Sequence, residues 1–397
     1  MHQLSEIPRL RRSSHDAYIL IVIAPDSFKE SLTASEAAWA IQRGIQKAAK
    51  KVKSEIRTIL LPLSDGGEGC RDALVGATGG RIVNVKCHDP LMRSLKGSIG
   101  VLSSGKTVIL DMASASGLSL LKQKERNPMI TTTFGTGDLI KAALDHGVDE
   151  IITGIGGSAT VDGGTGAAQA LGCRFFDHDN NLITQALSGG QLRRIKEIDL
   201  VKRDSRIDSV NICVACDVDN PFTGPGGAAN VYAPQKGASP EEVTILEENL
   251  LHLEEIIRRD IGIDLKHKPG SGASGGLGGG LHAFLDAQLS CGINLVLKVI
   301  NFREKIRQAD LIITGEGKLD TQTLRGKVIK GVCMEAKNMG VPVIALAGII
   351  EAGYEPLFRE GLSGVQCINP ETISLKEAME NAAMLLEKTA GEVIQKL

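Results

Sequence analysis

Apolar strand-like runs alternate with helical stretches along this chain, and this alternation constrains its fold more than any other feature. Four short apolar runs lack a polar face and therefore predict strands that are covered on both sides. These runs are residues 19–24, 150–155, 311–314 and 343–347. Apolar residues at helical spacing occupy 35–49, 136–146, 326–339 and 375–395. We therefore expect an α/β fold with a doubly wound sheet, Rossmann-like or flavodoxin-like.

Polar and glycine-rich segments follow the expected strands. Ligands of doubly wound sheets bind beyond the carboxyl ends of the strands. In this sequence those ends read Pro25-Asp26-Ser27, Gly156-Gly157-Ser158, Gly315-Glu316-Gly317 and Gly348. We expect the chemistry of the protein to lie at these positions.

The chain is expected to form two domains, because 397 residues exceed what one hydrophobic core normally serves. Residues 1–17 contain three arginines and no apolar core, which predicts a flexible N-terminal extension. The segments 61–129 and 173–289 contain shorter strand-like pieces than the rest of the chain. We therefore expect them to form a second, smaller α/β domain that is inserted into the first. The Rossmann-like domain then comprises 18–60, 130–172 and 290–397. The chain would cross between the domains several times, which predicts an active site in the interdomain cleft.

Charge and cysteine usage argue against several classes of function. The formal net charge is -2 without long blocks of one sign, so neither nucleic acid nor an anionic membrane is an expected partner. No stretch approaches the ~20 consecutive apolar residues of a membrane-spanning helix. The eight cysteines are scattered, which fits a reducing cytoplasm. Cys213 and Cys216 lie three apart in an expected strand and point to opposite faces, so we predict no thiol metal site.

Two familiar sequence patterns give little support for nucleotide binding by a P-loop or by a dinucleotide-binding fold. The P-loop pattern is absent. Residues 154–159 match the dinucleotide-binding pattern loosely after an expected strand, and Asp177 follows about 20 residues later. This match keeps a nicotinamide-dependent dehydrogenase open as an alternative. A closer match at 270–275 follows no expected strand and carries no weight.

Glycine-rich loops at 134–137, 156–160 and 272–280 can present backbone N–H groups to anionic oxygens. Each loop alone could equally be a turn that requires a positive φ, but together they favour a phosphate ligand. Phosphoryl transfer also uses carboxylates for a metal and for the hydroxyl proton, and cations for the developing charge. Helix capping or surface charge is the alternative role for each candidate. The candidates are Asp26, Asp65, Glu68, Asp162, Asp217, Asp219, Glu316, Asp320, Lys29, Lys236, Lys318 and Lys327.

Several long motifs occur in an order that is similar to that of the bacterial glycerate kinase family. Two of them read Ala24-Pro25-Asp26-Ser27-Phe28-Lys29-Glu30-Ser31-Leu32 and Ser64-Asp65-Gly66-Gly67-Glu68-Gly69. The others are 133–137, 154–160, 215–221, 234–238, 275–278 and 314–320. The chain resembles this family over residues 19 to 395, with small departures. Val161 stands where Asn is common, Asp111 where Glu is common and Lys318 where Arg is common.

The resemblance implies a kinase that uses ATP and Mg²⁺ to phosphorylate a hydroxyl group of D-glycerate. The expected product is 2-phosphoglycerate, and 3-phosphoglycerate or a phosphate of a related hydroxy acid is the alternative. A homodimer is compatible with the resemblance. A non-catalytic metabolite sensor on the same scaffold stands beside the dehydrogenase as an alternative of another class.

The resemblance also assigns roles to individual residues. The expected catalytic residues are Asp26, Lys29, Asp65, Glu316 and Asp320. The expected glycerate-binding residues are Ser27, Gly66, Gly67, Glu68, Asp217, Asn220 and Lys236. The expected ATP-binding residues are Gly135, Thr136, Gly156, Gly157 and Ser158. The expected metal ligands are Asp217 and Asp320.

Overall fold

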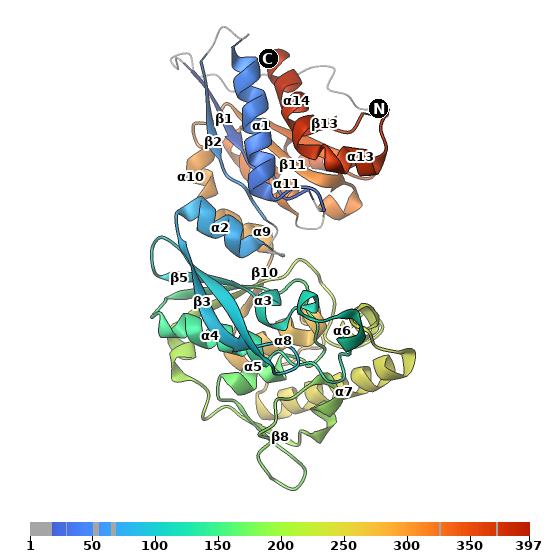
Figure 1. Cartoon of the computed structure of the whole chain (residues 1–397). Helices are drawn as coiled ribbons and strands as arrows, with labels where there is room; N and C mark the ends of the chain where they lie inside the picture. The colour runs from blue at the N-terminus through green and yellow to red at the C-terminus, as the bar shows by residue number, and fades with distance from the viewer. Residues whose placement is uncertain (1–17, 29, 51–54, 65–68, 325–326, 371) are drawn as a thin grey trace. The chain divides into compact units, whose positions relative to one another are not determined.

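The chain folds into two units, each with its own hydrophobic core (Figure 1). The computed structural model describes residues 18–28, 30–50, 55–64, 69–324, 327–370 and 372–397. The first unit comprises Met1–Asp65 and Ile293–Leu397, and the second unit comprises Gly66–Gly292. None of the helices in these described ranges is both long and apolar enough to span a membrane.

The first unit contains a parallel sheet of five strands in the order β13-β12-β11-β1-β2. These strands are β1 (Tyr18–Ile23), β2 (Glu55–Leu60), β11 (Leu311–Leu319), β12 (Val343–Ile350) and β13 (Leu362–Cys367). Counted along the chain within this unit, the order is that of flavodoxin-like doubly wound sheets. The direction in which strands are added reverses between β1 and β11, and this reversal is the topological switch point of the sheet.

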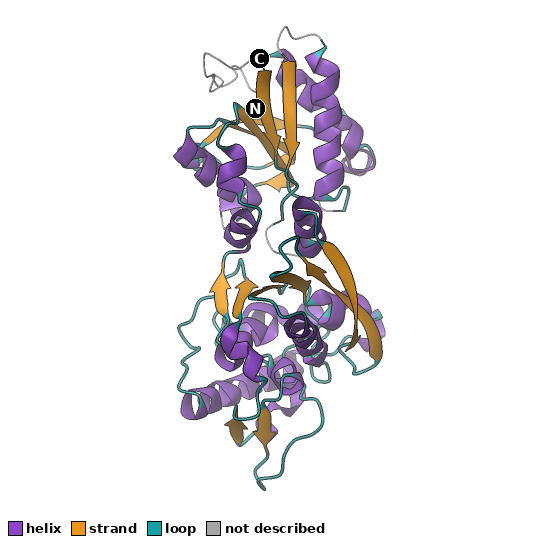
Figure 2. Cartoon of the chain, turned by 90° about the vertical axis from the view of Figure 1, so that its left-hand side faces the viewer, coloured by secondary structure: helices purple, strands orange, loops and turns teal. Residues whose placement is uncertain are grey.

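Helices cover both faces of this sheet (Figure 2). Because crossovers between parallel strands are right-handed, helices that follow β1 and β11 lie on opposite faces. The principal helices are α1 (Ala34–Ala49), α11 (Val328–Met339), α13 (Leu375–Glu380) and α14 (Ala382–Gln395). Shorter ones are α9 (Gly292–Val299), α10 (Phe302–Ile306) and α12 (Leu357–Glu360). Helix α1 begins at Thr33, whose side chain accepts a hydrogen bond from Glu36 N in a capping box.

The second unit contains a mixed sheet in the order β10-β9-β6-β5-β4-β3, with β10, β9, β6 and β5 parallel and β4 and β3 antiparallel. The strands are β3 (Arg81–His88), β4 (Ser94–Val101), β5 (Thr107–Asp111), β6 (Glu150–Gly154), β9 (Asn211–Ala215) and β10 (Gln288–Ser290). A separate pair consists of β7 (Arg174–Phe176) and β8 (Glu197–Asp199). The helices are α2 (Cys70–Thr78), α3 (Ala113–Ser116), α4 (Phe134–Asp145), α5 (Thr165–Ala170), α6 (Ala228–Tyr232), α7 (Pro240–Asp260) and α8 (Ala273–Leu285).

The α/β class predicted from the sequence is confirmed, but the division of the chain differs from the prediction. Residues 130–172 were expected in the Rossmann-like domain, yet β6 pairs with β5 and β9 and therefore belongs to the second unit. The second unit is also the longer of the two rather than the smaller, and the chain passes between the units twice rather than several times. The helix predicted at 375–395 is two helices that meet at Asn381.

Candidate functional site

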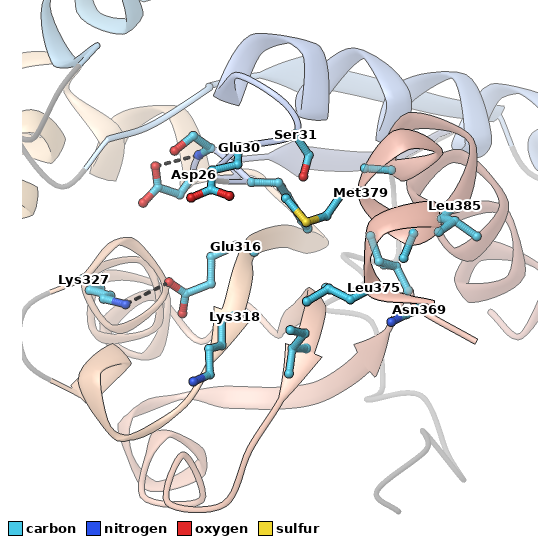
Figure 3. Close-up of a pocket in the computed structure, with 18 residues that line it drawn as sticks. Asp26, Glu30, Ser31, Glu316, Lys318, Lys327, Asn369, Leu375, Met379 and Leu385 are labelled. Atoms are coloured by element: carbon cyan, nitrogen blue, oxygen red, sulfur yellow. Dashed lines mark hydrogen bonds and ion pairs between the residues drawn. The ribbon is translucent and has the colours of Figure 1, made fainter. Parts of the chain in front are cut away.

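A cavity of about 360 Å³ lies in the first unit at the carboxyl edge of the sheet (Figure 3). Its walls come from the segments after β1 and β13, the later parts of β11 and β12, and helices α13 and α14. The cavity thus spans the switch point between β1 and β11, which is where doubly wound sheets bind ligands.

Asp26 follows β1 and lines this cavity together with Ser27. The Asp26 backbone N–H donates to Gly315 O at 2.8 Å, which ties this loop to β11. Its carboxylate Oδ1 accepts a hydrogen bond from Ser27 N at 2.6 Å. Asp26 is buried, and Glu30 beside it has a φ of +63°, a backbone conformation that non-glycine residues seldom adopt. The backbone hydrogen bond to Gly315 therefore keeps Asp26 next to β11.

Glu316 lies in β11, next to the loop that carries Asp26. Its side chain is buried, and Oε1 accepts a hydrogen bond from Thr323 Oγ1 at 2.5 Å. Lys327 Nζ lies 3.7 Å from Glu316 Oε2, an ion pair that is visible in Figure 3. Two carboxylates and one ammonium group are thus gathered at one end of the cavity.

Asp320 follows β11 and does not line the cavity. Burial raises the pKa of Asp320, but the hydrogen bond from Gln322 N and the charges of Lys318 and Lys327 outweigh this effect, so its pKa lies below the ordinary value. Lys318 does line the cavity, and its Nζ lies 3.4 Å from Asp320 Oδ2 and 2.9 Å from Glu351 Oε1. Asp320 therefore contacts the site through Lys318.

The opposite end of the cavity is apolar. In Figure 3, Leu375 and Leu385 lie away from the carboxylates, and Met379 on α13 also lines the wall. Ile349 from β12 and Ile368 after β13 are part of the same lining. The cavity therefore joins a charged end to an apolar end.

In the second unit, the loop after β6 carries Gly156, Gly157 and Ser158. Gly156 and Gly157 are exposed, and Gly157 has a φ of +74°. Ser158 is buried, and its Oγ lies 2.6 Å from Lys236 Nζ. Lys236 Nζ also donates to Thr160 O at 2.7 Å, so this side chain supports the loop from within the protein.

Lys236 itself is fully enclosed, with a relative exposure of 2%. Burial lowers the pKa of its ammonium group to about 7, against the opposing effect of the Asp162 carboxylate. In this structure the enclosed side chain contacts the loop at Ser158 and Thr160, and its expected contact with glycerate stays a prediction.

The carboxylate of Asp162 binds backbone N–H groups beside the glycine-rich loop 134–137, where a phosphate was expected from the sequence. Its carboxylate accepts hydrogen bonds from Thr133 N and Thr133 Oγ1 at the start of α4, both at 2.7 Å. It also accepts from Gly164 N and Gly166 N at the start of α5. The protein's own carboxylate therefore satisfies the donors at these helix ends.

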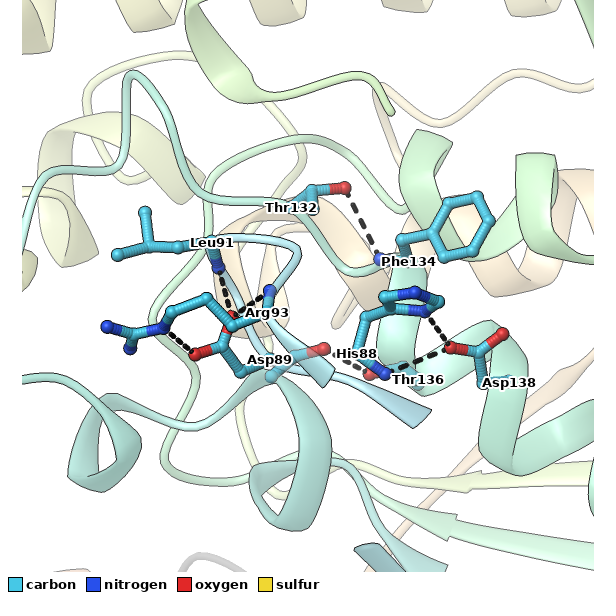
Figure 4. Close-up of polar contacts among 9 residues, drawn as sticks. His88, Asp89, Leu91, Arg93, Thr132, Phe134, Thr136 and Asp138 are labelled. Atoms are coloured by element: carbon cyan, nitrogen blue, oxygen red, sulfur yellow. Dashed lines mark hydrogen bonds and ion pairs between the residues drawn. The ribbon is translucent and has the colours of Figure 1, made fainter. Parts of the chain in front are cut away.

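Gly135 and Thr136 lie in the first turn of α4 and are buried. Figure 4 labels Thr136 and Asp138, which both belong to this helix. A Cβ atom at Gly135 would lie 1.9 Å from His88 O, so glycine allows β3 and α4 to approach closely. Thr136 Oγ1 is 2.8 Å from Ser116 Oγ. Nearby, His88 Nδ1 is 2.8 Å from Asp138 Oδ2, which anchors β3 to the same helix. Close packing therefore explains the glycine at position 135, and the expected contacts of Gly135 and Thr136 with ATP stay a prediction.

Asp217 and Asn220 lie in the segment after β9. Asp217 Oδ1 accepts a hydrogen bond from Gly292 N at 2.9 Å. Asn220 Nδ2 donates to Gly226 O at 2.8 Å, and Asn220 Oδ1 accepts from Tyr232 Oη at 2.7 Å. These contacts shape the loop in which both residues lie.

Asp111, at the end of β5, is a titratable group to which no role was assigned from the sequence. Burial raises the pKa of its carboxyl group to about 6, although Arg71 opposes the shift. Its Oδ1 atom is buried and has no hydrogen-bond partner in the part of the chain that the structure describes. A buried acidic group with a raised pKa therefore lies at the carboxyl edge of the second sheet.

Some expected residues cannot be placed. Lys29, Asp65, Gly66, Gly67 and Glu68 lie outside the described residues, as does the segment 1–17. Within the described ranges, no three histidine, cysteine or acidic side chains converge in a way that could hold a metal ion by themselves. The two expected metal ligands, Asp217 and Asp320, belong to different units.

The sequence reasoning missed Asn369 and the apolar wall formed by α13 and α14. Only a weak signal was present at Asn369, because the strand before it reads Leu-Ser-Gly-Val-Gln-Cys and lacks a continuous apolar run. Leu375, Ala378, Met379, Ala382 and Leu385 also follow helical spacing closely enough to predict one apolar face.

The structure removes the support for dinucleotide binding. No helix begins at residues 156–159 after β6; the next helix, α5, begins at Thr165. Asp177 follows β7, which pairs with β8 rather than with β6. A dinucleotide fold would need the helix directly after the glycines and the acidic residue on a neighbouring strand.

Comparisons with known proteins agree with the motif order. The model of the Glycerate kinase family matches residues 21–397. The glycerate kinase of Halalkalibacterium halodurans is 46% identical over 94% of this chain and 97% of its own length. The glycerate 2-kinase of Escherichia coli K12 is 42% identical over 91% of this chain and 93% of its own. A crystal structure of putative glycerate kinase 2 from Salmonella typhimurium LT2 matches with a TM-score of 0.82 and 42% identity, covering 95% of this chain and 97% of that one. This chain belongs to the glycerate kinase family.

Proposed function

We propose that this protein transfers the γ-phosphoryl group of ATP to D-glycerate in the cytoplasm and forms 2-phosphoglycerate. The observation that carries the proposal is the meeting of Asp26, Glu316 and Lys327 at the switch point of the first sheet, in a chain of this family. The name glycerate 2-kinase of the relative from Escherichia coli supports the 2-hydroxyl group as the acceptor. Eight free cysteines fit a reducing compartment.

Magnesium fits the residues at the charged end of the cavity. Mg²⁺ binds through one or two carboxylates together with waters and substrate phosphates, so it needs no cage of three protein ligands. Asp26 follows β1 and Glu316 lies in the adjacent strand β11, and one of the two would supply a carboxylate to the ion while the other stays free to accept a proton. The ion would neutralise charge that develops on the transferred phosphoryl group.

The remaining charged groups supply binding and proton transfer. Asp26 and Glu316 are our candidates for accepting the hydroxyl proton, and Lys318 and Lys327 for stabilising negative charge. In the second unit, the exposed backbone of Gly156 and Gly157 is a candidate for anion binding. Lys236 holds Ser158 in this loop and stabilises its position. By resemblance, Lys29, Asp65 and Glu68 also remain candidates for the site.

The product of the purified enzyme tests this proposal. The protein would be incubated with ATP, Mg²⁺ and D-glycerate, the product examined by phosphorus NMR, and enolase then added. Enolase uses 2-phosphoglycerate, so conversion to phosphoenolpyruvate is the expected result. A phosphoglycerate that resists enolase would move the phosphate to the 3-position. Folded protein that forms no phosphoglycerate would favour a metabolite sensor and overturn the proposal.

A variant at Asp26 separates this activity from that of a contaminating kinase. Asp26→Asn keeps the shape of the side chain but removes its negative charge. Turnover should fall by roughly 10²–10⁴-fold, the usual loss for a general base. Unchanged turnover in the folded variant would remove Asp26 from the site.

A further inference from the structure

The cavity of the first unit is larger and more apolar than glycerate requires. Glycerate is a three-carbon acid in which every carbon carries an oxygen, so it has little apolar surface to bury. A volume of about 360 Å³ falls in the range of roughly 300–1,000 Å³ that holds drug-sized ligands. The apolar end therefore leaves room for a ligand with more apolar surface than glycerate has.

The apolar lining of the cavity comes from two sides, α13 and the ends of β12 and β13. Leu375 and Met379 are one helical turn apart on α13, so their side chains lie on the same side of that helix. Ile349 lies in β12 and Ile368 directly follows the neighbouring strand β13, and Ile368 N donates to Ala347 O at 2.8 Å. Leu375 is 51% exposed, and a bound ring would cover this apolar surface.

Asn369 supplies a polar group in the same wall. Its Oδ1 atom is buried and has no hydrogen-bond partner among the residues that the structure describes. An unsatisfied buried acceptor is costly, and the terminal torsion of asparagine is broad enough to turn its amide towards a ligand. An asparagine amide both accepts and donates, and it pairs with the amine and adjacent ring nitrogen of adenine.

A neighbouring cavity of about 710 Å³ shares Ile368, Asn369 and Leu385 with the first one. Its lining includes Glu351, Glu355 and Glu392. Three carboxylates would repel the phosphates of a nucleotide. The first cavity instead offers Lys318 and Lys327 for the phosphates, with Asp26 and Glu316 beside them for Mg²⁺.

We propose that this cavity binds the phosphoryl donor as an adenine nucleotide, with the base between α13 and the ends of β12 and β13, and with Asn369 pairing with the edge of the base. The nucleotide would run along the carboxyl edge of the sheet, from Asn369 after β13 towards Lys327 beside β11. This assignment rests on the proposed function for the identity of the donor as ATP.

Calorimetric titration of the full-length protein with ADP and Mg²⁺ tests the assignment directly. Asn369→Leu removes both hydrogen-bonding groups at similar size, and Met379→Glu places a charge in the apolar wall. Each variant should weaken ADP binding tenfold or more and raise KM for ATP, while KM for D-glycerate stays within about twofold. Met384→Glu is the matched control, because Met384 is 61% exposed on α14 and lines neither cavity. It should bind ADP as the wild type does.

Asn369→Asp adds a test of base specificity. A carboxylate offers two acceptors, which match the two neighbouring N–H donors of guanine but only the amine of adenine. The ratio of kcat/KM for ATP to that for GTP should therefore fall at least tenfold in this variant. An unchanged ratio would contradict contact between Asn369 and the base.

The outcomes separate this assignment from the proposed function. If the wild type makes phosphoglycerate but the Asn369 and Met379 variants bind ADP normally, the assignment is wrong and the kinase stands. If these variants raise KM for D-glycerate instead, the cavity belongs to the acceptor. If the wild type makes no phosphoglycerate, the proposed function fails, and weaker ADP binding by both variants would still support a nucleotide cavity.

Discussion

Lys236 is the residue whose burial gives the clearest pH dependence. The pKa of its ammonium group falls from an ordinary value of 10.5 to about 7 in the folded protein. Between these values the unfolded chain holds a proton that the folded protein has released, so the contribution of Lys236 to stability rises with pH. Urea denaturation would give the free energy of unfolding of the wild type and of Lys236→Met. The wild-type value minus the variant value should rise from pH 6 to pH 10, because only the wild type carries this titrating group.

Lys202→Met provides the control for this measurement, because Lys202 is an exposed lysine of the same unit. The free energy of unfolding of the wild type minus that of Lys202→Met should stay nearly constant over the same pH range. A flat curve for Lys236→Met as well would show that the ammonium group keeps its proton when buried.

Residue types were easier to predict than residue environments. The sequence identified Asp162, Thr136 and Lys236 as polar residues beside glycine-rich loops, yet all three are buried against protein atoms. Asp162 binds Thr133, 29 positions away, and Lys236 binds Ser158, 78 positions away. Contacts over such separations depend on the tertiary fold, so local patterns could not distinguish a structural carboxylate from a ligand-binding one.

At the scale of elements, the start of α8 depends on glycine for two separate reasons. Ser274, Gly275 and Gly276 all have positive φ values before the regular part of the helix begins. A Cβ atom at Gly275 would also lie 1.9 Å from Thr160 O, the carbonyl group that binds Lys236. Gly275→Ala should therefore destabilise the protein by backbone strain of about 1–2 kcal/mol and by an additional ~2–3 kcal/mol from the steric clash.

Gly79→Ala isolates the backbone part of this effect. Gly79 ends α2 with a φ of +70°, close to the +74° of Gly275, but no atom lies within 4 Å of the Cβ position. Urea denaturation should show a clearly larger loss of stability for Gly275→Ala than for Gly79→Ala. Equal losses would mean that the chain around Thr160 moves aside without cost.

Elements were predictable where the signal is local. The strands at 19–24, 150–155, 311–314 and 343–347 and the helix at 35–49 all lie within a few residues of the observed elements. The partner of a strand is not a local property: β1 pairs with β11, nearly 300 residues away, whereas β6 joins the other sheet. Apolar strands of both sheets look alike in sequence, so 150–155 was assigned to the wrong unit.

At the scale of the whole molecule, each unit has a hydrophobic cluster whose described members all come from that unit. The core of the first unit gathers β1, β11 and β12 with α1 and α14, and it includes Leu311. The core of the second unit gathers the mixed sheet with α4, α7 and α8, and it includes Leu250. Both leucines are fully buried. Separate cores imply that each unit can lose structure locally, at a free energy set by its own packing.

Matched substitutions in the two cores test this independence. Leu311→Ala and Leu250→Ala each leave a cavity and should cost about 2–5 kcal/mol in the unit that contains them. In native-state hydrogen exchange followed by mass spectrometry, Leu311→Ala should lower amide protection in β1, β11 and β12 and leave β5, β6 and β9 unchanged. Leu250→Ala should give the reverse pattern. If either substitution lowers protection equally in both sheets, the two units unfold as a single cooperative structure, and the separate cores do not define separate stabilities.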